Sequence, residues 1–172
     1  RTGYYEKYYD WFRARLKINH YAKLHSKYSL GYSLEGQISN PIKMANYAST
    51  IINVPTFYPL QDSKTLFNEG LRAFGYAAAG LQNVYSIHPR LDVRLEGYAF
   101  MPFNKVISNA MQEPILNKFN AQDIAFASSF SLVFHSPIGP LAVNANYYSN
   151  SKNPFGLFAH FGYILFSKTS LE

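Results

Sequence analysis

Hydrophobic and polar side chains alternate along most of the chain with a period of two. Successive side chains of a β-strand point to opposite faces, so this period predicts strands with one apolar and one polar face. A helix would instead scatter the charges of the first run around its circumference. The alternating runs span, in chain order, residues 12–24, 28–37, 71–82, 91–101, 124–135, 141–148 and 156–166. The pattern therefore predicts seven antiparallel strands.

The clearest junction between two runs contains Pro137, Gly139 and Pro140. Proline cannot donate to a strand ladder, and glycine adopts backbone angles that other residues avoid. We therefore expect these three residues to form a structural turn that ends one strand and starts the next.

Short and long connections alternate between the predicted strands. In an up-and-down sheet this places all long loops at one edge, as in outer-membrane barrels, whereas a soluble β-sandwich has no reason to sort its loops. The strand lengths also suit a tilted membrane crossing. Short turns are expected at about 24–27, 87–90 and 136–140, and long outside loops at about 40–69, 103–122 and 149–155. The first long loop is expected to contain a short helix within Met44–Val54.

Composition leaves the same two options, a soluble sheet or a sheet facing lipid. Only 15% of the 172 residues are charged, against the roughly 25% usual in soluble domains. Aromatic residues make up 17%, which suits strands and membrane interfaces alike. No cysteine is present, so disulfides and thiolate metal sites are excluded. The chain begins at Arg1 without a methionine, and we expect a mature or truncated segment.

The net charge is +6, and six basic residues share the polar parity of their strands: Arg13, Arg15, Lys17, Lys23, Arg72 and Arg94. One interpretation is a basic lumen that attracts anions or a passing polypeptide; the other is a polar interior balanced by Glu35, Asp92 and Glu96. Nucleic acid is not an expected partner, because the basic residues alternate inward without a recognition motif. The predicted basic lumen face consists of Arg13, Arg15, Lys17, Arg72 and Arg94.

The sequence predicts neither catalysis nor a cofactor for this chain. The segment 31–36 (Gly-Tyr-Ser-Leu-Glu-Gly) has the wrong glycine spacing for a nucleophile elbow, so Ser33 is expected to be an inward strand residue. The five histidines show no metal-ligand spacing.

Two motifs resemble those of Omp85-type surface-antigen barrels. The run 136–141 (Ser-Pro-Ile-Gly-Pro-Leu) resembles their last periplasmic turn. The run 158–166 resembles their C-terminal assembly signal, with His160, Gly162 and Leu165 in its positions, although its last hydrophobic place falls on Ser167. This resemblance implies the bacterial outer membrane, its lipid and the barrel-assembly machinery.

The whole chain, residues 1–172, resembles the barrel of Bacteroidetes-type patatin-like phospholipases through the runs 8–16, 94–98 and 166–172. The fold expected is an all-β, antiparallel, up-and-down transmembrane barrel of the outer-membrane type. This chain would supply seven or eight strands, as the C-terminal half of a larger barrel completed by an N-terminal half or a second copy.

The function implied by the resemblance is to anchor, and in one version to export, a patatin-like lipase carried upstream. One alternative is an Omp85-type translocating or insertion pore, although the Arg-Gly-Phe or Arg-Gly-Tyr triplet of such pores does not occur in the chain. A second alternative is a small stand-alone structural barrel.

Overall fold

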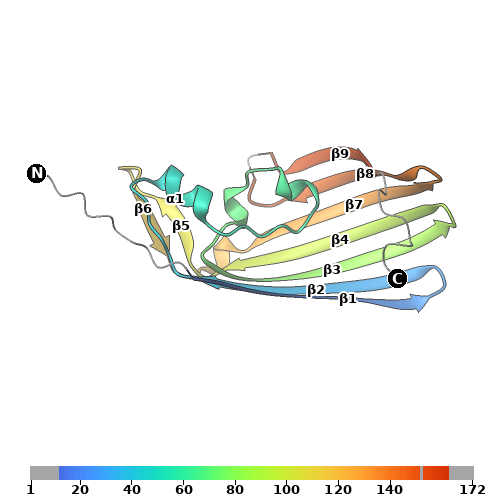
Figure 1. Cartoon of the computed structure of the whole chain (residues 1–172), viewed down its shortest axis with the longest axis horizontal. Helices are drawn as coiled ribbons and strands as arrows, with labels where there is room; N and C mark the ends of the chain where they lie inside the picture. The colour runs from blue at the N-terminus through green and yellow to red at the C-terminus, as the bar shows by residue number, and fades with distance from the viewer. Residues whose placement is uncertain (1–11, 152, 163–172) are drawn as a thin grey trace, which may run out of the picture.

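The structure is a computed structural model that describes residues 12–162, except residue 152. Its main feature is a seven-stranded antiparallel sheet in the order β1-β2-β3-β4-β7-β8-β9 (Figure 1). The strands are β1 (Arg13–His25), β2 (Tyr28–Ser39), β3 (Gly75–His88), β4 (Leu91–Pro102), β7 (Ala125–Ser136), β8 (Gly139–Tyr148) and β9 (Phe155–Phe161). Each strand of this sheet pairs with the next one along the chain, so the fold is an all-β up-and-down meander, as predicted.

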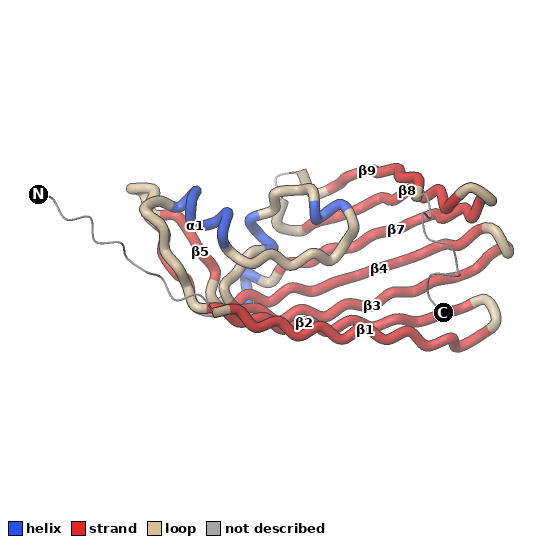
Figure 2. The backbone as a smooth tube through the Cα atoms, in the orientation of Figure 1, coloured by secondary structure: helices blue, strands red, loops and turns tan. Residues whose placement is uncertain are grey.

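Tight turns lie at one end of the sheet and long connections at the other (Figure 2). The first long connection contains α1 (Tyr47–Asn53), in which the Asn46 side chain accepts a hydrogen bond from the backbone of Ser49, together with the short 3-10 turns η1 (Asp62–Lys64) and η2 (Glu69–Leu71). The expected short helix is therefore present.

The second long connection is more ordered than the sequence predicts. It contains a two-stranded hairpin of β5 (Lys105–Ser108) and β6 (Pro114–Asn117), followed by the 3-10 turn η3 (Ala121–Asp123). Strands of four residues are too short to show a clear period of two, which is why the pattern predicts only a loop.

The two faces of the sheet have opposite character, and it is the polar face that is buried. In β2, Ser33, Glu35 and Gln37 are 8%, 5% and 4% exposed, whereas Leu34 and Ile38, on the other parity, are 50% and 60% exposed. The pairing register carries these parities from strand to strand. We call the face with Glu35 the covered face and the face with Leu34 the bare face.

Residues 55–72, between α1 and β3, cover the polar face near the long-loop end (Figure 1). Phe57 stacks on Phe100 with ring centroids 5.6 Å apart and also contacts the rings of Tyr76 and Tyr98. The main hydrophobic cluster therefore lies between this loop and the sheet. It contains Phe57, Leu60, Leu71, Ala73, Tyr76, Ala78, Tyr98, Phe100, Ala125, Ala127 and Tyr148.

One predicted strand start is wrong. The strand expected to start at Leu71 starts at Gly75, because Thr56 forms an isolated bridge with Arg72 and holds residues 71–74 against the loop. Arg72 is therefore outside the strand to which the basic face was assigned. The last strand is described to Phe161, and residues 163–166 of its expected length lie outside the described residues. In the described part of the chain the sheet is open, with β1 and β9 at its edges.

Candidate functional site

The best-defined polar cluster of the covered face centres on Glu35. Its Oε1 atom accepts a hydrogen bond from the Tyr76 hydroxyl at 2.6 Å and pairs with Arg15 Nη2 at 2.7 Å, and its Oε2 lies 3.7 Å from Lys17 Nζ. The carboxylate is 2% exposed, whereas the Arg15 and Lys17 side chains are 38% and 44% exposed. A buried carboxylate thus joins β1, β2 and β3 through charge-assisted hydrogen bonds.

A second polar cluster joins β3 and β4. The Tyr98 hydroxyl donates to Glu96 Oε2 at 2.8 Å and accepts from Gln82 Nε2 at 2.5 Å. The ring of Tyr98 lies over Gly80, its directly paired neighbour, where any β-carbon would collide with it. Glycine is required here by close approach, and it lets the aromatic ring lie flat on the sheet.

A third cluster lies at the tight-turn end. Asp92 accepts from Ser86 Oγ at 2.7 Å, pairs with His135 Nε2 at 2.7 Å and lies 3.9 Å from Arg94. Both Arg94 and the Glu35 partners Arg15 and Lys17 are therefore close to acidic groups. This distribution favours the balanced interior among the two interpretations of the basic residues.

Arg72 was predicted to lie in a strand, but its side chain instead contacts the end of α1. Its Nη1 donates to the backbone carbonyls of Ile51 and Ile52 at 3.1 and 3.2 Å, at the end of α1. The guanidinium also lies 4.3 Å from the ring centroid of Phe67. A cation at the C-terminal carbonyls stabilises a short helix. Burial lowers the pKa of this guanidinium.

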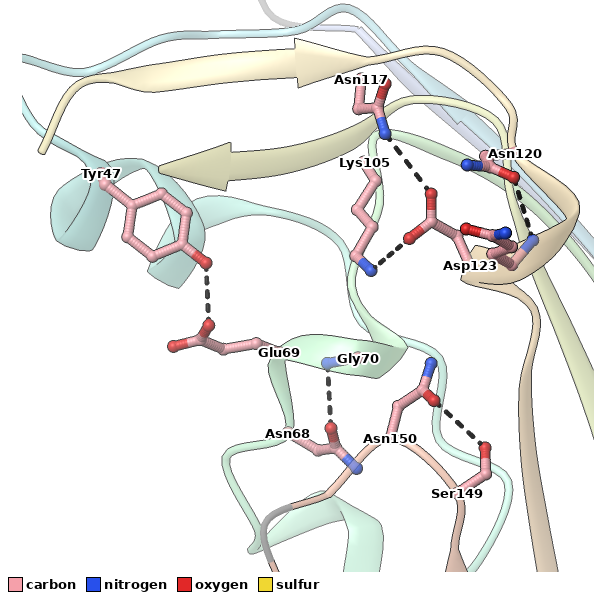
Figure 3. Close-up of polar contacts among 11 residues, drawn as sticks. Tyr47, Asn68, Glu69, Gly70, Lys105, Asn117, Asn120, Asp123, Ser149 and Asn150 are labelled. Carbon is pink, nitrogen blue, oxygen red and sulfur yellow. Dashed lines mark hydrogen bonds and ion pairs between the residues drawn. The ribbon is translucent and has the colours of Figure 1, made fainter. Parts of the chain in front are cut away.

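Polar contacts also hold together the elements within each long connection (Figure 3). The Tyr47 hydroxyl of α1 donates to Glu69 of η2 at 2.8 Å, and burial together with this bond raises the pKa of Tyr47 to about 12. Lys105 of β5 pairs with Asp123 of η3 at 2.7 Å. The Tyr47 backbone N–H also donates to the Gln112 carbonyl, between β5 and β6, at 2.8 Å. The first two long connections are therefore joined to each other.

The predicted structural turn is built around Gly139. Pro137 lies in the turn, and Gly139 starts β8 with a φ of 144°, a left-handed value that favours glycine. Pro140 pairs with His135 inside the ladder, and its carbonyl accepts from the Gly162 backbone at 2.9 Å. A β-carbon on Gly139 would collide with the Gly162 carbonyl.

Two of the three predicted assembly-signal residues can be placed. His160 lies in β9, with its Nδ1 3.2 Å from Asn144 Nδ2, and Gly162 follows the strand beside the structural turn. Leu165 lies outside the described residues.

No arrangement for metal chemistry occurs in the described residues, which hold no group of three or more His, Asp or Glu side chains suited to a metal ion. Ser33 lies within β2, paired with Gly80, rather than at a strand-to-helix turn. Of the helices in residues 12–162, none has the length and hydropathy to cross a membrane.

No protein-family model, curated protein or solved structure matches the chain. The resemblance to patatin-linked barrels stays a prediction from the motifs.

Proposed function

We propose that the chain is a segment of an outer-membrane-type transmembrane β-barrel that anchors a larger protein. The observation that carries this proposal is the bare face, an exposed apolar surface across the sheet. It includes Leu16, Ile18, Leu34, Ile38, Leu81, Leu95, Phe126, Phe130, Leu132, Phe134, Leu141 and Leu157. Soluble monomers rarely expose contiguous apolar patches larger than a few hundred Å². In an outer-membrane barrel, a face of this kind is in contact with lipid acyl chains.

A soluble sandwich would use its faces the other way round. Two packed sheets bury their apolar faces against each other and expose the polar ones. Among the described residues, the chain's own segment 55–72 covers the polar face, and no segment covers the apolar one. Because residues 55–72 pack on the polar face, lipid is favoured over a second sheet as the partner of the bare face.

The open edges define the partners that the proposal needs. Unpaired strand edges are heavily penalised in the hydrocarbon region, so β1 and β9 require strands from the rest of the polypeptide or from a second copy. Insertion would use the barrel-assembly machinery, and the location would be the bacterial outer membrane.

The packing of residues 55–72 favours an anchor over a translocating pore. Phe57, Leu60 and Leu71 are at most 6% exposed against the covered face, and the Tyr148 hydroxyl donates to Asp62 at 2.8 Å. This segment occupies the space that a conducting lumen would need. Within the proposal, the patatin-like lipase is the cargo implied by the sequence resemblance, and this chain itself supplies no catalysis.

The test uses the full-length protein in native membranes and in planar bilayers. We expect it to resist alkaline carbonate extraction, to give no steady single-channel conductance, and to release fatty acid from phospholipid through its upstream region. Extraction by carbonate alone would refute the membrane barrel. Steady conductance would refute the plugged anchor in favour of the pore, and absence of lipase activity would refute the cargo.

A further inference from the structure

The strand β1 lies at one edge of the main sheet and is exposed along almost its whole length. All of its residues except Ala22 are exposed, and among the described residues one side of its backbone has no partner strand. Leu16 and Ile18, on the bare face, are 67% and 48% exposed. An unpaired edge of this kind is a template for another strand, so the identity of that strand can be inferred from what β1 presents to it.

The direction of the strands limits what can pair with this edge. Each strand of the sheet is antiparallel to its neighbour and the described sheet has seven strands, so β1 and β9 run in the same direction. A second copy in the same membrane orientation would therefore offer its β9 parallel to β1, and only an inverted copy could place its own β1 antiparallel to it. Bacterial outer-membrane barrels consist of antiparallel strands. The described strands of a second copy are therefore unsuited to this edge, and another part of the same polypeptide is favoured.

The covered face of β1 carries more positive charge than the neighbouring strands balance. Arg15, Lys17 and Lys23 all lie on this face, whereas Glu35 is the one acidic side chain on the covered face of β1, β2 and β3. Glu35 pairs with Arg15 at 2.7 Å and lies 3.7 Å from Lys17, and Lys23 forms no ion pair with a described residue. Directly opposite side chains on neighbouring strands stabilise a sheet when their charges differ in sign and destabilise it when they agree. The charge of β1 therefore favours an acidic neighbour.

We propose that β1 pairs with an antiparallel strand from another part of the same polypeptide, and that this strand carries acidic side chains on the covered face, one of them opposite Lys23. The inference rests on the proposed membrane barrel and adds the chemistry of the partner strand to it. On its other parity the partner strand carries apolar residues opposite Leu16 and Ile18, because directly opposite side chains lie on the same face of a sheet.

The test is zero-length cross-linking of the full-length protein in phospholipid vesicles with a water-soluble carbodiimide. This reagent joins a lysine amine to a carboxylate in direct contact with it through an amide bond, and the carbodiimide leaves as its urea. Isotopically light and heavy copies are mixed before reconstitution, so mass spectrometry separates links within one polypeptide from links between two. The Lys105–Asp123 pair, at 2.7 Å, is the internal control for the reaction.

We expect Lys23 to be linked to an aspartate or glutamate outside residues 12–162, within one polypeptide. Lys23→Glu should raise the unfolding equilibrium constant in urea about fivefold, because it places a like charge opposite the acidic strand. Lys23→Gln, which removes the charge without reversing it, should have a smaller effect. Lys118→Glu makes the same charge change at an exposed position after β6 and should alter the constant by less than about twofold. Since Lys23 has no ion pair to lose among the described residues, its effect reports the neighbouring strand.

Links from Lys23 between light and heavy copies would identify a second copy as the partner and overturn the proposal. It is also overturned if the Lys105–Asp123 link forms while Lys23 forms none, or if Lys23→Glu and Lys118→Glu have equal effects. The cross-link is measured on the unaltered protein, so it decides the matter even where a variant does not fold. None of these outcomes changes the result of carbonate extraction, conductance or lipase assay, so this proposal and the proposed function fail separately.

Discussion

The Glu35 cluster gives the most specific prediction for the stability of the sheet. The substitution Glu35→Gln keeps the size of the side chain but removes its charge. The Arg15 and Tyr76 bonds to Oε1, at 2.7 and 2.6 Å, then become weaker bonds to a neutral amide. We expect a lower free energy of unfolding because both bonds lose their charge assistance.

The magnitude follows from the geometry. A hydrogen bond to a charged group contributes about 1.5–3 kcal/mol, and a neutral one about 0.5–1.5 kcal/mol. Two such bonds therefore lose about 2 kcal/mol together. The Lys17 contact, at 3.7 Å from a side chain that is 44% exposed, adds less than about 1 kcal/mol. Glu35→Ala should cost more, about 3–5 kcal/mol, because the buried Tyr76 hydroxyl also loses its acceptor.

The assay is urea unfolding of the full-length protein in phospholipid vesicles, followed by circular dichroism of the strand signal. Glu113→Gln is the control, because it removes the same charge from an exposed position between β5 and β6 and should cost less than about 0.5 kcal/mol. A double-mutant cycle with Arg15→Met isolates the ion pair. Equal unfolding free energies for Glu35→Gln and Glu113→Gln would refute the reasoning.

Three further substitutions test the contacts that shape the covered face. Gly80→Val should displace the Tyr98 ring from the sheet and lower the free energy of unfolding by about 2 kcal/mol in the same urea assay; a loss below about 0.5 kcal/mol would contradict that packing. Gly139→Ala should cost about 1–2 kcal/mol because its φ of 144° strains a side chain, and wild-type stability would argue against this turn geometry. Tyr148→Phe should speed amide hydrogen exchange in residues 55–72 by about fivefold, because it removes the bond to Asp62, which is worth about 1 kcal/mol; unchanged exchange would show that apolar packing alone holds the segment.

The period of two was sufficient to predict the seven strands of the main sheet and their two faces. The parity that carries Ser33, Glu35 and Gln37 is the polar one in the sequence and the buried one in the structure. The alternation of tight turns with long connections is also visible in the chain, because proline, glycine and loss of periodicity mark both kinds.

The contents of the long connections could not be predicted in the same way. Phe57 and Leu60 lie in a proline-rich stretch without periodicity, and only their apolar character signalled that they would fill the covered face. Arg72 matched the parity of the following strand by coincidence, since it follows the short 3-10 turn η2, forms the isolated bridge with Thr56 and is separated from β3 by Ala73 and Phe74. The Glu35–Tyr76 bond depends on cross-strand register, which a parity pattern does not contain.

The most direct test of the central claim is to measure whether lipid or water surrounds neighbouring side chains on the two faces of β2 and of β7. The chain has no cysteine, so single cysteines can be placed in the full-length protein, with any others removed, at Ser33 and Leu34 of β2 and at Ser131 and Leu132 of β7. Each carries a nitroxide spin label in reconstituted vesicles, and collision with lipid-soluble oxygen is compared with collision with a water-soluble nickel chelate. The account predicts high oxygen and low nickel accessibility at both leucine positions, and lower oxygen accessibility at both serine positions. Nickel accessibility at Leu34 and Leu132 equal to that of an exposed loop would show that the bare face does not meet lipid, and would contradict the account.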